Sequence, residues 1–351
     1  MPKRNSLFSN PRPMTPEAYD LADALFALAP WNWMSEEQLI AIRHPETGRL
    51  DHISVMGAAG NHFSLALYHG AEARQRFNLM QSEVFDKNPQ TNADTLSLIL
   101  DTPQLQASFS DRGDLFKSEL TAIKKHGRKY RGDAWPSFRS FSPGHCPIPA
   151  NPQETAWLCT AIRQVLDVAP SLRLSDTYRY DRGLMEILTR ECLDGTWQTT
   201  WTKDDGALFS FPQPEPNAFL IEKIRRHPRE VPLEVHFQLV PNPVGKSRET
   251  SLFPYLLLIV EPKSHFVLGA SMLSIENQPY EALIATLPDE FLRVCDKHAI
   301  RPTSIAVASP ATQCLLVNTA AALDIPCKLK KRLPAIDDAL GSLMNFMGGM
   351  A

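Results

Sequence analysis

The order of elements predicted over residues 232–347 constrains the fold more than any other feature of the sequence. A strand of alternating apolar and polar residues comes first, and a buried strand with its hairpin partner follows. Helices and strands then alternate to the end. This order predicts a mixed sheet covered by helices. The predicted strands are Pro232–Leu239, Leu256–Val260, Phe266–Leu273, Thr303–Ala308 and Cys327–Lys330, and the helices are Tyr280–His298, Ala311–Leu323 and Pro334–Met347.

The first half of the chain mixes helices with short strands. Thr15 and Pro16 are typical of a helix start, because a threonine caps and a proline fits the first turn. Pro45-Glu46-Thr47-Gly48 predicts a turn between two strands. The expected elements are a helix at 15–29; strands Gln38–Arg43, Leu50–Met56 and His62–Tyr68; a helix Gly70–Gln81; short strands Thr95–Asp101 and Gln104–Phe109; a helix Asp111–His126; a loop at 128–151; and a helix from Asn151 that ends before Pro170.

The length of the chain predicts two domains. At 351 residues it exceeds what one hydrophobic core usually serves. We expect an α+β domain followed by an α/β domain with a mixed sheet. The expected divisions are a flexible leader at 1–14, the α+β domain at 15–170, a bridging segment at 171–230 with a strand near 195–201 and a helix Ala218–Arg226, and the α/β domain at 231–351.

The composition is that of an ordinary globular protein. Hydrophobic residues make up 43% and charged residues 21%, so a disordered chain is not expected. The net charge of -3 argues against a protein coated in nucleic acid, although a local basic surface is compatible with it. The six scattered cysteines are typical of buried thiols in a reducing compartment. With no long apolar segment in the sequence, we expect a cytoplasmic protein with no membrane contact and no cofactor.

Several short motifs follow one another through the first half of the chain. They are Pro30-Trp31-Asn32-Trp33-Met34, His44-Pro45-Glu46-Thr47-Gly48, Val55-Met56-Gly57-Ala58-Ala59-Gly60, Tyr68-His69-Gly70, Lys129-Tyr130-Arg131-Gly132 and the stretch from Trp135 to Gly144. Over about residues 15–165 this pattern resembles a family of bacterial proteins known only as domains of unknown function. The second half, marked by Arg301-Pro302-Thr303-Ser304-Ile305-Ala306-Val307, looks like the partner module of that family. The resemblance implies membership and no activity.

The order of elements in the second half is also similar to the ribonuclease H-like fold of integrases and transposases. That resemblance implies two metal ions held by carboxylates on the first strand, the fourth strand and a late helix. Glu261 follows Leu256–Val260, taken as the first core strand, and Asp337 and Asp338 lie near the start of the last helix. Ser309 stands at the fourth-strand position, where an acid is needed. The resemblance therefore implies a degenerate copy that does not cleave.

A basic stretch with interleaved aromatic residues covers residues 117–141. Basic side chains can neutralise phosphates and exposed aromatic rings can stack on bases, so the stretch is a candidate nucleic-acid interface. The alternative is a solvated helix face with the aromatic rings in the core and the arginines paired with carboxylates. The candidate residues are Lys124, Lys125, Arg128, Lys129, Arg131, Trp135 and Arg139.

Three further motifs favour structural roles. Trp31-Asn32-Trp33-Met34 could form a platform for a ligand, but aromatic residues just after a helix more often close a core, which is what we expect here. Gly57-Ala58-Ala59-Gly60 joins two strands and lacks the following helix that a phosphate loop needs. His145 and Cys146 are adjacent, an arrangement that rarely lets a base activate a nucleophile.

Three hypotheses follow. The first is a non-catalytic binding or regulatory protein with an unidentified partner. The second is a nucleic-acid-binding protein that uses the basic stretch. The third is an atypical metal-dependent nuclease built on Glu261 with Asp337 or Asp338. We expect the protein not to be an enzyme.

Overall fold

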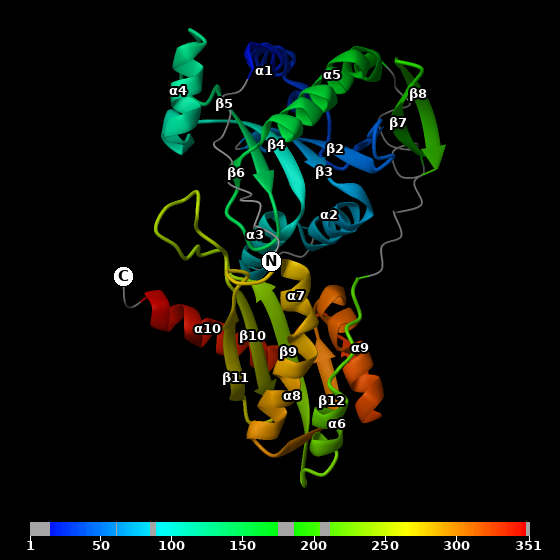
Figure 1. The fold of residues 1–351 in the computed structure, drawn as a ribbon, viewed down its shortest axis with the longest axis vertical. Helices are drawn as coiled ribbons and strands as arrows, with labels where there is room; N and C mark the ends of the chain where they lie inside the picture. The colour runs from blue at the N-terminus through cyan, green and yellow to red at the C-terminus, as the bar shows by residue number, and fades with distance from the viewer. Residues whose placement is uncertain (1–14, 61, 85–88, 175–185, 204–210, 349–351) are drawn as a thin grey trace, which may run out of the picture. The chain divides into compact units, whose positions relative to one another are not determined.

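The computed structural model divides into two compact units, each built on its own mixed sheet (Figure 1). It describes residues 15–60, 62–84, 89–174, 186–203 and 211–348. The predicted leader at 1–14 lies outside the described residues. The first unit holds residues up to Phe209 except Gly144–Cys146, and the second holds those three residues and the chain from Ser210 onward. The predicted fold class, an α+β region followed by an α/β region, is confirmed.

The first unit is built on an eight-stranded sheet in the order β6-β5-β4-β3-β2-β1-β7-β8. Its neighbouring strands are antiparallel except for β1 and β7, which are parallel. The strands are β1 Ile40–Arg43, β2 Leu50–Met56, β3 Phe63–Tyr68, β4 Gln104–Ser110, β5 Trp135–Phe141, β6 Ile148–Pro149, β7 Glu186–Leu193 and β8 Thr196–Lys203.

Helices cover both faces of this sheet. α1 and α5 share the larger hydrophobic core with one face, while α2 packs on the other (Figure 1). Thr15 caps α1 as predicted, because its hydroxyl accepts a hydrogen bond from the backbone N–H of Ala18 at 3.4 Å. The helices are α1 Pro16–Leu28, η1 Pro30–Asn32, α2 Gly70–Val84, α3 Pro89–Asp101, η2 Arg112–Asp114, α4 Lys117–Lys125 and α5 Pro152–Leu174.

Some local predictions for this unit are wrong. Thr95–Asp101 is the end of helix α3, because a short apolar run fits a helix as well as a strand. Of the helix predicted at Asp111–His126, only η2 and α4 form. β5 lies within the predicted loop, and α5 continues past Pro170. The segment treated as a bridge contributes β7 and β8 to this sheet.

The second unit is built on a five-stranded sheet in the order β11-β10-β9-β12-β13. β9, β10 and β11 are antiparallel neighbours, whereas β12 runs parallel to both β9 and β13. All the strands predicted here are present, with changed ends. They are β9 Arg229–Leu239, β10 Tyr255–Glu261, β11 Phe266–Leu273, β12 Ile300–Val307 and β13 Cys327–Leu329.

Helices of the second unit follow the predicted order with one division. The single helix expected at Tyr280–His298 forms two, α7 and α8, which meet at Thr286 just before Pro288. α10 packs its first turns on Leu256, Leu258 and other apolar residues of one sheet face. Across the described ranges, no helix is long and apolar enough to cross a membrane. The helices are α6 Ala218–Ile224, α7 Tyr280–Ala285, α8 Leu287–Lys297, α9 Pro310–Leu323 and α10 Pro334–Gly348.

Candidate functional site

The acidic residues proposed for a nuclease site have other partners. Glu261, at the end of β10, accepts hydrogen bonds from Arg229 at 2.6 Å and from the Ser264 hydroxyl at 3.1 Å. Asp338, on α10, is 2.7 Å from the ring nitrogen Nδ1 of His265. Two neighbouring residues of the turn between β10 and β11 contact these acids: Ser264 contacts Glu261, and His265 contacts Asp338. The two acids share no partner among these contacts.

The serine at the fourth-strand position has a local role. Ser309 follows β12 and is the N-cap of α9, where its hydroxyl accepts from the backbone N–H of Thr312 at 3.4 Å. A cap of this kind satisfies one of the free N–H groups at a helix start. The structure therefore accounts for Ser309 without reference to a metal ion.

The first strand of this sheet is β9, not the strand that precedes Glu261. Leu256–Val260 forms β10, the second strand of this sheet along the chain, so taking it as the first core strand in the ribonuclease H-like comparison is wrong. The sequence reasoning missed Glu234, a buried acid on β9. Leu233 and Val235 point to the opposite face by alternation, so the pattern of β9 already separated Glu234 from them.

Glu234 is buried against the start of α10 and is 2% exposed. One carboxylate oxygen accepts from the backbone N–H groups of Ala335 at 3.1 Å and Ile336 at 3.4 Å. The other oxygen lies 3.9 Å from the Lys330 ammonium. The carboxylate satisfies free donors of the helix and sits at the positive end of its dipole, so it stabilises α10 from the neighbouring strand.

A histidine lies two residues along the same face of β9. Burial lowers the pKa of His236 to about 4, although the nearby Asp337 carboxylate acts in the opposite direction. The ring is therefore neutral at pH 7. Among the described residues, no group of three or more His, Cys, Asp or Glu side chains is arranged to hold a metal ion. The donors around Glu234 are N–H and ammonium groups, which do not fit the two-metal site implied by the resemblance.

Two arginines of the basic stretch are paired with carboxylates. Arg139 lies in β5, buried; it donates to Glu119 at 3.1 Å and to the carbonyl of Asp114 at 2.8 Å. Arg128 pairs with Asp20 and, at 2.7 Å, with Asp23. These contacts agree with the alternative interpretation, in which the arginines of the stretch are paired with carboxylates. Neither arginine is therefore available to bind phosphate.

The remaining members of the stretch divide between packing and exposure. Trp135 packs against Tyr130, with ring centroids 5.8 Å apart, and the Arg112 guanidinium lies 5.8 Å from its ring. Among the candidate residues, the basic side chains that stay exposed are Lys124, Lys125, Lys129 and Arg131, and Lys117 at the start of the stretch is exposed as well.

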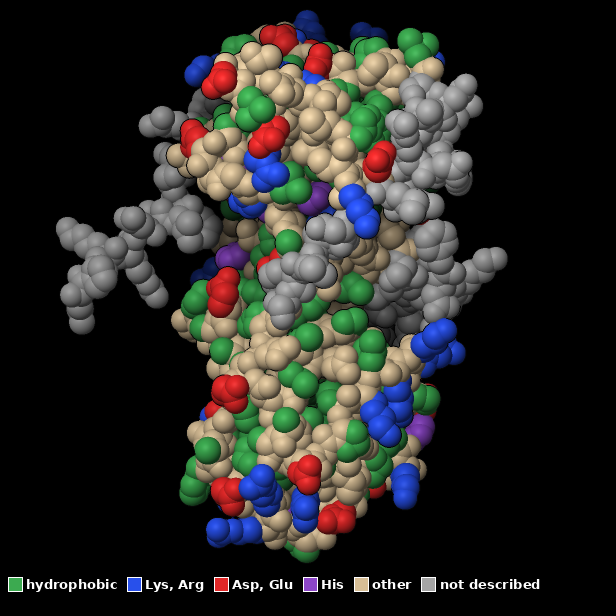
Figure 2. All heavy atoms as spheres, turned by 90° about the vertical axis from the view of Figure 1, so that its right-hand side faces the viewer, with side chains coloured by type: hydrophobic (Ala, Val, Ile, Leu, Met, Phe, Trp, Pro, Cys, Tyr) green, Lys and Arg blue, Asp and Glu red, His purple; other side chains and the backbone are tan. Residues whose placement is uncertain are grey.

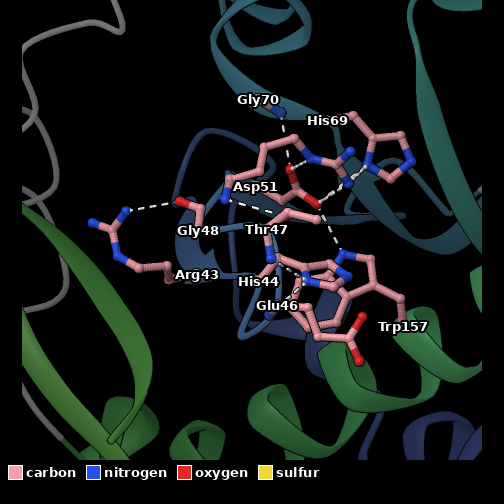
Figure 3. A network of polar contacts seen from close by, with 10 residues as sticks. Arg43, His44, Glu46, Thr47, Gly48, Asp51, His69, Gly70 and Trp157 are labelled. Carbon is pink, nitrogen blue, oxygen red and sulfur yellow. Dashed lines mark hydrogen bonds and ion pairs between the residues drawn. The ribbon is translucent and has the colours of Figure 1, made fainter.

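A buried carboxylate organises the polar interior of the first unit (Figure 3). Asp51, on β2, is 0% exposed and accepts from Arg49 through both oxygens, at 2.6 and 2.8 Å. The Trp157 indole N–H on α5 donates to it at 2.8 Å, and the backbone N–H of Gly70 donates at 3.0 Å. His69 Nδ1 lies 3.2 Å away. Segments far apart in the sequence therefore meet at one carboxylate.

The surroundings of Asp51 favour its charged form. Burial alone would raise the pKa of Asp51, but hydrogen bonds from His69 and Arg49, the nearby His69 charge and Trp157 hold it at about 2. The turn beside it is ordered by His44, whose Nδ1 accepts from the backbone N–H groups of Glu46 and Thr47. With its oxygens saturated by donors, Asp51 acts as a cross-link of the fold (Figure 3).

The aromatic motif after α1 is part of the core, as expected. Trp31 is 4% exposed, and its ring centroid lies 5.2 Å from Phe63 and 5.6 Å from Phe109. Met34 is buried in the same cluster. Sequence reasoning found these residues, but it missed Arg49, Asp51 and Trp157, whose association depends on the fold.

His145 and Cys146 do not form an activated pair. Burial lowers the pKa of His145 and raises the pKa of the Cys146 thiol, so both groups favour their neutral forms. A nucleophilic cysteine requires the opposite, a thiolate stabilised by a nearby cation.

Comparison with known families finds one match in each unit. Residues 16–190 match the model of a domain of unknown function, DUF7309, and residues 220–344 match a second, DUF6930. The first match ends within β7, and the second lies wholly in the second unit. No curated protein matches the chain. DUF7309 covers the eight-stranded sheet as far as β7, and DUF6930 covers the five-stranded sheet, so the Asp51 network and Glu234 lie in different domains.

Proposed function

We propose that this chain is a non-catalytic binding protein whose DUF6930 domain is a ribonuclease H-like module that does not cleave nucleic acid. The order of elements that suggested the resemblance, from β9 through a hairpin and alternating helices to α10, supports the fold assignment. Fold alone implies no activity, so the case depends on the individual side chains.

The observation that carries the proposal is the environment of Glu234. A metal-binding carboxylate must offer its lone pairs to a cation, but this one accepts from Ala335 and Ile336 at the start of α10. Ser309, on the fourth-strand side, is likewise used as a helix cap. Residues at two of the catalytic positions therefore stabilise helices instead.

The cysteines support a cytoplasmic location for this binding role. All six are free thiols in the structure. Burial raises the pKa of Cys295 to about 12, which makes this thiol a poor nucleophile and slow to oxidise.

The experiment is a cleavage assay on the whole chain. Labelled single- and double-stranded DNA and RNA oligonucleotides are incubated with the protein and Mg²⁺ or Mn²⁺. We expect no metal-dependent cleavage from the wild type. Cleavage that Glu234→Gln abolishes, and that Glu230→Gln at the start of the same strand leaves intact, would overturn the proposal.

Nucleic-acid binding through the basic stretch is a second candidate. It is favoured by five exposed cations for which the described residues show no acidic partner, namely Lys117, Lys124, Lys125, Lys129 and Arg131. On the face seen in Figure 2, by contrast, charges of both signs are interspersed. Binding of this kind should weaken steeply with salt.

Heparin chromatography tests the second candidate. We expect the double variant Lys124→Glu, Lys125→Glu to elute at lower salt than the wild type if the stretch binds phosphates. The matched control is Lys328→Glu, Lys331→Glu on the other exposed basic cluster. Equal elution of the wild type and the first variant would exclude the stretch as the interface.

A further inference from the structure

The two edges of the five-stranded sheet differ in how strongly they discourage pairing with another strand. β13, at one edge, is three residues long and carries the exposed Lys328, with Lys330, Lys331 and Arg332 directly after it. Short edge strands and lysines are common means of preventing a sheet from pairing with a second chain. β11, at the other edge, is eight residues long and contains no charged residue and no proline. The β11 edge therefore lacks the protection that the β13 edge has.

Apolar side chains of β11 are open to solvent. Met272 is 57% exposed, whereas Leu256, its cross-strand neighbour on β10, is 4% exposed beneath α10. Ala270 lies on the same face, opposite Leu258, and is also exposed. Helix α10 thus covers β10 but leaves this part of β11 uncovered. Exposed apolar residues at an unprotected sheet edge mark a surface suited to association.

A β-bulge limits the part of β11 that can take a regular partner. Ile259 pairs with Gly269 and Val260 pairs with Val267, so Leu268 is the extra residue. The bulge bends the strand at this point and increases its twist. The regular part is therefore 269–273. Among the described residues, no strand pairs with the outer side of this segment, since β11 is the last strand of its sheet.

The order of side-chain sizes along 269–273 fits an antiparallel pair of identical strands. When Ser271 lies opposite Ser271 of a second copy, Ala270 lies opposite Met272, and Gly269 lies opposite Leu273. Each large side chain then faces a small one, and no charge meets a like charge. A two-fold axis at Ser271 relates the two copies and uses both β11 edges, while the lysine-rich β13 edges stay outside. Association therefore stops at two copies.

The direction of α10 fits the same arrangement. Its first turns pack on β10, and its C-terminal end runs past the β11 edge (Figure 1). The helix lies on the face that carries Ala270 and Met272. In a two-fold pair, each α10 reaches over that face of the other copy, where these two side chains are uncovered. Their burial would add an apolar contribution to the backbone hydrogen bonds of the paired strands.

We propose that two copies of this chain associate through β11, antiparallel about Ser271, and join their five-stranded sheets into one continuous sheet. An extended segment of another protein could also add to a free edge. A second copy is favoured because 269–273 itself supplies both the small and the large residues that complement each other. This inference goes beyond the proposed binding role and does not depend on Glu234.

Size-exclusion chromatography with light scattering on the whole chain tests the proposal. We expect a dimer at about 100 µM and a growing fraction of monomer on dilution, as in any reversible association. Met272→Lys places a charge inside the interface twice, once from each copy, so the dissociation constant should rise about a hundredfold. Leu329→Lys is the matched control, because it adds the same charge at an exposed apolar position on the β13 edge. It should dimerise as the wild type does.

A charge exchange between two variants tests the register. Ala270→Glu alone should also be a monomer, for the same reason as Met272→Lys. An equal mixture of these two variants should form a mixed dimer, because position 270 of one copy lies opposite position 272 of the other and opposite charges attract across paired strands. Both positions are exposed in the single chain, and circular dichroism checks that the variants fold.

Three results would contradict the pairing. A wild type that stays monomeric at about 100 µM would leave the edge to another partner or to none. A loss of dimer in Leu329→Lys as large as that in Met272→Lys would place the interface elsewhere. A mixture of Ala270→Glu and Met272→Lys that stays monomeric would exclude the register about Ser271.

Discussion

Asp51 in the DUF7309 domain and Glu234 in the DUF6930 domain are both buried carboxylates, but their partners differ. Asp51 is bonded mainly by side chains, from Arg49, His69 and Trp157, which come from separate parts of the chain. Glu234 is bonded by consecutive backbone N–H groups at the start of one helix. The first acid joins several elements, and the second joins β9 to α10.

The difference bears on how a buried acid is interpreted. A buried carboxylate in an α/β domain suggests catalysis or metal binding. Here each acid has partners that account for its burial. Both oxygens of Asp51 accept hydrogen bonds, while Glu234 accepts two at one oxygen and has the Lys330 ammonium 3.9 Å from the other. Asp51 therefore acts as a cross-link and Glu234 as a cap. The predictions below measure how far these two roles differ in stability.

The largest effect is expected for Asp51→Ala. It leaves the buried Trp157 N–H and the backbone N–H of Gly70 without their acceptor, and each such donor costs about 1–3 kcal/mol of unfolding free energy, while the half-exposed Arg49 guanidinium returns to water. Urea unfolding followed by circular dichroism measures the change. Glu46→Ala, on the exposed turn nearby, is the control and should have little effect. A loss for Asp51→Ala below about 1 kcal/mol would contradict the cross-link role.

A smaller effect is expected for Glu234→Ala, about 2 kcal/mol, because the variant removes a cap from α10 and leaves its first N–H groups buried. The loss should be local. Amide hydrogen exchange at Ala335 and Ile336 should rise more than exchange in α9. Glu230→Ala provides the control, since its contact with Arg301 at 3.4 Å is exposed to solvent. Uniform exchange in both helices would show that Glu234 does more than cap α10.

The neutral histidine beside Glu234 gives a prediction about pH. Burial lowers the folded-state pKa of His236 to about 4, below its value in an unfolded chain. Between about pH 6.5 and pH 4 the unfolded state takes up a proton that the folded state does not, so stability falls as the pH falls. We expect His236→Gln to remove up to about 2 kcal/mol of that loss. The measurement is urea unfolding at pH 7 and pH 5.

Exposed His62 supplies the comparison for this pH effect. His62→Gln should leave the loss between pH 7 and pH 5 as it is in the wild type. If His236→Gln behaved in the same way, the His236 ring would be accessible to protons in the folded state, and the face of β9 under α10 would be less closed than its contacts indicate.

The sequence predicted most of the second domain because its signals are local. Strand alternation at Pro232–Leu239 is a property of neighbouring residues. The same alternation separated Glu234 from Leu233 and Val235. What it could not show was that α10 covers the face of Glu234, since that contact joins residues about a hundred positions apart.

The sequence could not predict the Asp51 network for the same reason, because its contacts join residues far apart in the chain. Its motifs, His44–Gly48 and Tyr68–Gly70, were visible in the sequence, but Trp157 meets them only when α5 lies on the sheet. The error at Thr95–Asp101 has another cause. A short apolar run does not distinguish a helix from a strand. In the structure this run is the end of α3, which begins at Pro89, a residue that fits the first turn of a helix.

The smallest effect, and the one that best separates a cap from a lost ligand, is expected at Ser309. Ser309→Ala removes the acceptor for the Thr312 N–H and should lower the free energy of unfolding by about 1 kcal/mol.

Ser309→Asp retains a capping oxygen, so its unfolding free energy should stay near that of the wild type. It also places a carboxylate at the fourth-strand position of the proposed ribonuclease H-like fold. If Glu234 were free to bind a cation, this variant would restore part of a metal site, and Mg²⁺ would raise its Tm. We expect no Mg²⁺-dependent rise, because the Glu234 oxygens are held by α10 and Lys330. A rise in Ser309→Asp that is absent in the wild type and in Ser309→Asp with Glu234→Gln would show that Glu234 can exchange its helix-capping contacts for a metal ion.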